Sequence, residues 1–156
     1  MRRLLPLALV LVLAAAGCGG SSGGTSKQDY AKDLGQAGQT LQKTFADILA
    51  QTGSGTSTKQ TGDRLDRGAR ALDDAAKRFD GIDPPSDAKG AHKKLVDGLH
   101  ELADVFRKGA ASARKNNTKA LTATLQGLAT SDGVKKITEA QKELESKGVT
   151  VSTTGG

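Results

Sequence analysis

Apolar residues recur every three or four positions through most of the chain, which places them on one side of an α-helix. The first stripe follows Ser26, which forms a helix-capping pattern with Asp29, and it stops before Gly53. The second has candidate caps between Thr56 and Thr58 and stops at Gly81. The two stripes comprise Tyr30, Leu34, Ala37, Leu41, Phe45 and Ile48, then Leu65, Ala69, Leu72, Ala76 and Phe79.

The third stripe is the most regular, and we expect Ser86 to mark the start of its helix. Asn116 and Asn117 end it, and Thr118 is the expected cap of a fourth segment. The fourth stripe slips in phase around residues 131–133, which predicts a kink or a short break. These stripes comprise Ala88, His92, Leu95, Leu99, Leu102, Phe106, Gly109 and Ala113, then Leu121, Leu125, Leu128, Val134, Ile137 and Leu144.

Four amphipathic segments joined by short connections predict an all-α fold, an antiparallel up-down four-helix bundle over residues 26–147. Its stability should be modest, because helix-interior glycines each cost about 1 kcal/mol relative to alanine. Residues 148–156 are mostly small and polar, and we expect a disordered tail there. The glycines concerned are Gly35, Gly38, Gly68 and Gly98.

The first residues have the layout of a secretory signal peptide. Arg2 and Arg3 precede an apolar run from Leu4 to Ala16, interrupted only by Pro6. This run is shorter than the roughly 20 residues that a transmembrane helix needs. We therefore expect a signal peptide over residues 1–17 and a flexible glycine- and serine-rich tether over residues 18–25.

Ala15-Ala16-Gly17-Cys18 resembles the lipobox of bacterial lipoproteins, although leucine usually stands where this chain has Ala15. The resemblance implies cleavage before Cys18, which then carries acyl chains such as palmitate and becomes the first residue of the mature protein. The alternative is cleavage after Ala16 and release as an ordinary secreted protein. A lone free thiol fits poorly, since the only cysteine of the chain would be an exposed, unpaired group.

Charge does not point to nucleic acid. The formal charge of the whole chain is +6, and without Arg2 and Arg3 the remaining 21 basic and 17 acidic residues give +4. The few aromatic residues do not alternate with basic clusters, as a stacking platform for bases would require. We expect no nucleic-acid partner.

Basic residues form two adjacent columns on the third helix, each with a seven-residue step. One interpretation is a strip that contacts anionic headgroups or envelope polyanions, and the other is an ordinary solvated helix face. On the second helix, acids precede bases by four residues, which favours ion pairs along that helix. The strip comprises Lys93, Lys94, His100, Arg107, Lys108, Arg114 and Lys115, and the expected pairs are Asp63–Arg67, Asp66–Arg70, Asp73–Lys77 and Asp74–Arg78.

Catalytic and metal-binding patterns are weak. His92 lies on the core-facing stripe, and we expect it at the edge of the core with a hydrogen-bond partner. Asp97, His100 and Asp104 have a spacing like that of di-iron bundles, but the other helices supply no matching ligands. Two S-x-x-K tetrapeptides, at Ser86 and Ser112, lack the accompanying motifs of serine acyltransferases. We expect no catalytic residues, no metal ligands and no cofactor.

The whole chain resembles the small helical lipoproteins of unknown function in the envelopes of high-GC Gram-positive bacteria. Many of these carry a Pro-Pro turn and then a helix with an early histidine, where this chain has Asp83-Pro84-Pro85 and His92; it lacks the C-terminal cysteine of some members. The leading hypothesis is a non-enzymatic binding or structural module, lipid-anchored on the extracytoplasmic side of the cell membrane, with an envelope protein or anionic surface as partner. The alternatives are a small-ligand or metal carrier that uses the bundle interior near His92, and a serine hydrolase, which we do not expect.

Overall fold

The computed structural model describes residues 25–50 and 57–151, and these residues form helices and turns without any strand. The predicted signal peptide, Cys18 and the tether up to residue 24 lie outside the described residues, as do residues 51–56 and 152–156. The elements are α1 (Lys27–Ala50), α2 (Thr58–Asp80), α3 (Lys89–Arg114), α4 (Thr118–Gly127), the short 3₁₀ helix η1 (Leu128–Thr130) and α5 (Asp132–Ser146).

The first two helices begin with the predicted kind of cap. Ser26 Oγ accepts a hydrogen bond of 3.1 Å from the backbone N–H of Asp29, and its hydroxyl donates to the Asp29 carboxylate. Ser57 and Gln60 form a complete capping box at the start of α2, which ends at Gly81 as expected. These local hydrogen bonds satisfy backbone groups that a helix terminus leaves without partners.

Two predicted helix starts are wrong. Ser86 lies in an exposed turn, and α3 begins after Ala88, whose N–H donates to the carbonyl of Pro85. Asn117, and not Thr118, caps α4, because its side chain accepts from the N–H of Ala120 at 3.0 Å. The turn before α3 is therefore two residues longer than predicted, and the turn before α4 is one residue shorter.

The predicted break in the fourth segment is confirmed. η1 ends α4, and Ser131 then caps α5 by accepting from the N–H of Val134. The phase slip in the apolar pattern therefore corresponds to a new helix start. Leu121 on α4 lies near Gly109 of α3, whereas Ile137 on α5 lies near Gly98 of α3.

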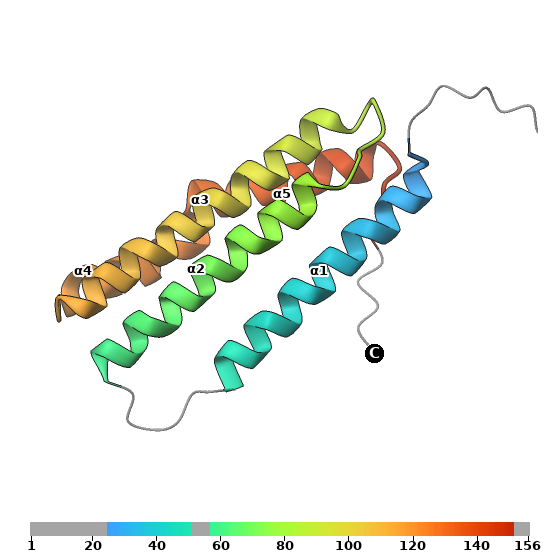
Figure 1. The fold of residues 1–156 in the computed structure, drawn as a ribbon. Coiled ribbons are helices and arrows are strands. Elements are labelled where there is room, and N and C mark those ends of the chain that lie inside the picture. Colours follow the sequence, from blue (N-terminus) through green and yellow to red (C-terminus); the bar gives the residue numbers. More distant parts are fainter. Residues whose placement is uncertain (1–24, 51–56, 152–156) are drawn as a thin grey trace, which may run out of the picture.

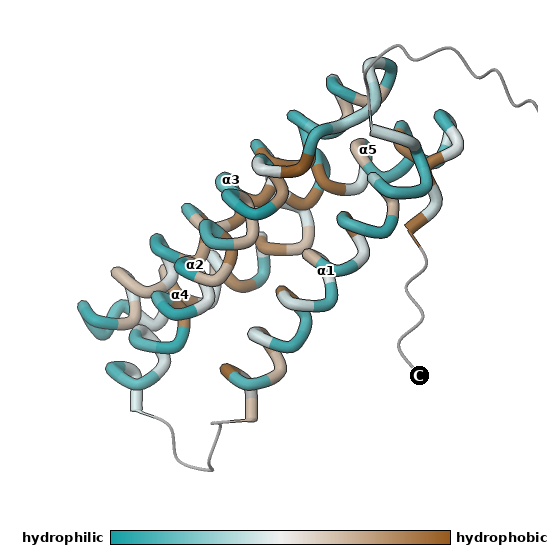
Figure 2. The backbone as a smooth tube through the Cα atoms, turned by 45° about the vertical axis from the view of Figure 1, so that its right-hand side comes forward, coloured by the Kyte–Doolittle hydropathy of each residue, from teal (hydrophilic) through white to brown (hydrophobic). Residues whose placement is uncertain are grey.

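The helices form the predicted bundle, with α2 and α3 as its centre (Figure 1). α2 and α3 are antiparallel and share the largest interface, while α5 covers the first half of α3 and α4 covers the second half. α1 lies along the outer side of α2. In Figure 2 the hydrophobic positions lie mainly on the sides of the helices that face one another, and the hydrophilic positions lie mainly on the outer sides.

Two glycines allow α3 and α5 to cross with their backbones in contact. A Cβ at Gly133 would lie 2.7 Å from the backbone nitrogen of Leu102 and 2.8 Å from the carbonyl oxygen of Gly98. A Cβ at Gly98 would lie 2.8 Å from Ile137 Cγ1. The helix-propensity penalty expected at Gly98 is therefore offset by packing, whereas a Cβ at Gly38 would meet nothing within 4 Å.

The ordered domain extends beyond the predicted boundary at residue 147. Gly148, with φ of 76°, follows α5, and the N–H groups of Gly148 and Val149 bond to the carbonyls of Glu145 and Leu144. This is a Schellman motif, which requires the left-handed conformation that glycine adopts readily. Val149 is 1 % exposed, so the expected disordered tail begins instead as a helix cap whose valine packs into the core.

Candidate functional site

An apolar groove lies between α1 and α5. It encloses about 380 Å³, and its floor is formed by α2 and α3. The groove exists because α1 packs on α2 and α5 packs on α3, while α1 and α5 have little direct contact. Its lining comprises Leu34, Gly38, Leu41, Phe79, Leu95, Leu99, Ile137, Leu144, Val149 and Val151, with Gln42, Gln141 and Glu145 as the polar members.

The helical period explains the two walls. Leu34, Gly38 and Leu41 follow one another at steps of four and three along α1, and Ile137 and Leu144 are two turns apart on α5. Gly38 widens the groove, since it has no side chain and the space where a Cβ would point is empty. The stripes on α1 and α5 are therefore only partly covered by the rest of the bundle.

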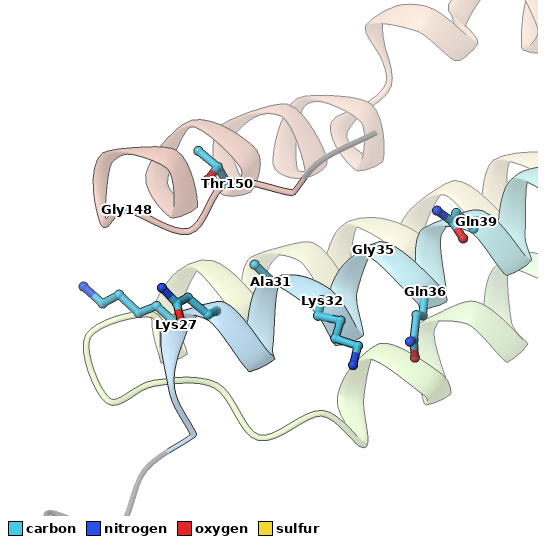
Figure 3. A pocket seen from close by; sticks show the side chains of 9 residues that line it. Lys27, Ala31, Lys32, Gly35, Gln36, Gln39, Gly148 and Thr150 are labelled. Atoms are coloured by element: carbon cyan, nitrogen blue, oxygen red, sulfur yellow. The ribbon is translucent and has the colours of Figure 1, made fainter. Parts of the chain in front are cut away.

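The segment after α5 divides the gap between α1 and α5 into an apolar and a polar part. Val149 and Val151 line the groove, whereas Gly148 and Thr150 line a polar cavity of about 530 Å³ beside α1 (Figure 3). This alternation is that of an extended chain, in which successive residues face opposite sides. Val151 meets α1 at Gly35, where a Cβ would lie 3.6 Å from its Cγ1. The groove was not predicted from the sequence. The one local feature that could have indicated it is the apolar–polar alternation of Val149, Thr150 and Val151.

His92 is not among the residues that line the groove, although it lies about one helical turn before Leu95 on α3, and it is hydrogen-bonded as predicted. Its Nδ1 lies 2.8 Å from the hydroxyl of Tyr30, and the two side chains are 6 % and 0 % exposed. Burial lowers the pKa of His92 below 6.5, although Asp80 and Asp83 act in the opposite direction. Burial likewise raises the pKa of Tyr30 to about 12. Both groups are therefore held neutral at pH 7.

The lowered pKa of His92 predicts a stability that falls in mild acid. Below pH 6.5 the unfolded chain binds a proton at this histidine that the folded protein resists, so the free energy of unfolding decreases as the pH drops from 6.5 toward the folded-state pKa. We expect the urea midpoint of the mature protein to be lower at pH 5.5 than at pH 7.5. His92→Gln should flatten this dependence, and the exposed control His100→Gln should retain it. Equal slopes for the two variants would contradict this assignment.

The basic strip of α3 contacts acidic residues on its neighbours. One column faces α2, where His100 and Arg107 both pair with Asp73. Arg114, in the same column, pairs with Asp63 at 3.3 Å and with Asp66. The other column faces α5, where Lys94 pairs with Glu143, and this hydrogen bond raises the pKa of Lys94.

These pairs reduce the positive charge that the strip presents to solvent. Lys93 also has a partner, Asp97 at 2.7 Å, so that five of the seven predicted residues contact an acid. Lys108 and Lys115 are exposed and make no ion pair within residues 25–50 and 57–151. Three of the four acids expected to pair along α2, namely Asp63, Asp66 and Asp73, pair with residues of α3 instead. The fourth, Asp74, pairs within α2, but with Lys77 at 4.0 Å and not with Arg78.

The residues that weakly suggested metal or catalytic chemistry have other roles. Asp97 binds Lys93, and Asp104 binds Arg107 at 2.7 Å. In the part of the chain that the structure describes, no three histidine, cysteine, aspartate or glutamate side chains are grouped so as to hold a metal ion. Ser86 stays exposed in its turn.

No protein-family model, curated protein or solved structure matches this chain. Among residues 25–50 and 57–151, none of the helices combines the length and the apolar character needed to cross a bilayer.

Proposed function

We propose that this protein is a lipid-anchored binding module on the extracytoplasmic face of a bacterial cell membrane, without enzymatic activity. Attachment is supported by the sequence around Cys18, the only cysteine, which follows an apolar leader and precedes a glycine- and serine-rich tether. The binding role is supported by one observation, the apolar groove between α1 and α5. A cleft lined mostly by apolar side chains with a few polar groups is the usual form of a binding site.

The partner proposed for this module is an apolar group presented at the membrane or by another envelope protein. The groove has ten apolar or glycine positions against three polar ones, so it excludes a strongly charged ligand. Contact with an anionic surface has less support. Within the basic strip of α3, only Lys108 and Lys115 lack acidic partners in the described ranges.

Lipid attachment predicts that Cys18→Ser abolishes acylation. Wild-type protein made in a host with lipoprotein-processing enzymes should begin at Cys18, carry the added mass of its acyl chains and enter the detergent phase on partitioning. Two acyl chains on one residue meet the two-signal requirement for stable anchoring. Labelled palmitate should be incorporated by wild type and by the control Ser21→Ala, but not by Cys18→Ser. Intact mass and label incorporation are the measurements.

A cysteine at another tether position should not replace Cys18. Cys18→Ser/Ser21→Cys restores the thiol three residues later, outside the lipobox-like context, and we expect it to remain unlabelled. An unacylated mature wild type, or label retained by Cys18→Ser, contradicts the proposal and leaves the secreted alternative.

A carrier for a small apolar ligand is the second candidate, and the volume of the groove favours it. About 380 Å³ lies within the roughly 300–1,000 Å³ of small-molecule sites. This space lies beside Leu95 and Leu99 and not at His92, which bonds to Tyr30. Native mass spectrometry of protein from its own host distinguishes the candidates, since a carrier retains added mass that a variant with a filled groove, Gly38→Leu, loses.

A further inference from the structure

We infer that the groove between α1 and α5 accepts one of the acyl chains carried on Cys18 of the same molecule. The inference rests on the proposed lipid attachment, and it names the occupant of the groove. Three observations lead to it: the chemistry of the lining, the length of the tether, and the scarcity of other apolar surface.

The lining matches a neutral hydrocarbon chain. Aliphatic side chains and Phe79 form its walls and floor, and Glu145 is its only charged member. The carboxylate of a free fatty acid would be repelled by Glu145, and its own desolvation would be unfavourable. An acyl chain linked through glycerol to the sulfur of Cys18 has no such charge. The lining therefore favours an esterified chain over a free acid.

The tether is long enough to reach the groove. Cys18 is seven residues before Thr25, the first described residue, so the connection spans up to about 25 Å when extended and roughly 15 Å on average. Leu34, the nearest groove residue on α1, lies seven residues after Lys27, or about 10 Å along the helix. An acyl chain from Cys18 can therefore enter the groove without any movement of α1.

A second copy of the protein is a poorer occupant. In the described residues the large apolar side chains that are exposed are Leu125 and Val151. Val151 already lines the groove, and Leu125 is a single side chain on α4, which covers the other half of α3. One side chain does not supply the contiguous apolar patch by which protein partners recognise a groove.

Photocrosslinking from the acyl chain tests the inference on the full, processed protein. A fatty acid with a photoreactive diazirine is incorporated metabolically at Cys18, the protein is irradiated, and labelled peptides are mapped by mass spectrometry. We expect crosslinks to groove residues of α1 and α5. Gly38→Leu, which fills the groove, should reduce them at least five-fold, and Gly90→Leu should not, because Gly90 is equally open but lies outside the groove.

A second pair of variants keeps the test independent of helix packing. Val151→Asp places a carboxylate at the groove edge, where the side chain is 37 % exposed, and should also reduce the crosslinks. Thr150→Asp, on the polar side of the same segment, should leave them unchanged. Circular dichroism establishes that each variant is folded before it is compared.

The outcomes separate this inference from the proposed function. Acyl label on Cys18 with crosslinks outside the groove, or crosslinks unaffected by Gly38→Leu and Val151→Asp, overturns the inference and leaves the anchor. Crosslinks that join two molecules overturn it as well, since the occupant is then a neighbour's acyl chain. A Cys18 that carries no label overturns the proposed function and, with it, the inference.

Discussion

Replacing Gly133 with alanine should lower the free energy of unfolding by about 3 kcal/mol, the upper part of the range for added atoms in a packed core. The new Cβ would lie 2.7 Å from the backbone nitrogen of Leu102 and 2.8 Å from the carbonyl oxygen of Gly98. Backbone atoms on the facing helix cannot rotate away as a side chain can. The whole α3–α5 interface must therefore separate to admit one methyl group.

The matched control is the same substitution at a helix-interior glycine with free space. Gly38→Ala introduces a Cβ that meets nothing within 4 Å, so its higher helix propensity should raise stability by up to about 1 kcal/mol. Urea unfolding of the mature protein measures both variants. A Gly133→Ala protein within 0.5 kcal/mol of wild type, roughly the effect of an ordinary surface substitution, would show that the helices do not cross this closely.

Removing the Tyr30 hydroxyl should lower the free energy of unfolding by about 1 to 3 kcal/mol. In Tyr30→Phe the ring still fills its fully buried site, but Nδ1 of His92 loses its partner at 2.8 Å. A buried polar atom without a hydrogen bond retains the desolvation penalty of folding and gains nothing in return. The expected decrease in the free energy of unfolding therefore comes from the unpaired histidine nitrogen as much as from the missing tyrosine hydroxyl.

A double-mutant cycle isolates this pair. We expect Tyr30→Phe to have a much smaller effect in a His92→Leu background, where no ring nitrogen is left unpaired. Circular dichroism in urea follows unfolding, because the chain has no tryptophan and Tyr30 itself is its only tyrosine. Additive effects of the two substitutions would indicate that the contact contributes no coupling energy.

The helices could be predicted from the sequence because their signals are local. The stripe spacing located the α-helices of residues 25–50 and 57–151, and the phase slip near Ser131 located the break between α4 and α5. Helix starts were less predictable, since Ser86 and Thr118 are reasonable caps by composition. The turn geometry selects Ala88 and Asn117 instead. Composition also suggested disorder after residue 147, but a single buried valine, Val149, holds that segment to the core.

The candidate site could not be predicted, because it depends on which helices fail to touch. Leu34 and Ile137 looked like ordinary core positions, and only the separation of α1 from α5 leaves a space between them. The charges of α3 posed the same difficulty. A seven-residue column such as His100 and Arg107 has the same pattern whether it faces solvent or, as here, an aspartate on the next helix.

The peripheral position of α1 implies that the bundle opens in stages. α2, α3 and α5 share the larger interfaces, whereas α1 joins them mainly along α2 and through the Tyr30–His92 bond near its beginning. Elements with smaller buried interfaces separate at lower free energy than the rest of a protein. Of the two walls of the groove, α1 is therefore the one we expect to separate from the bundle at the lower free energy, while α2, α3 and α5 stay folded.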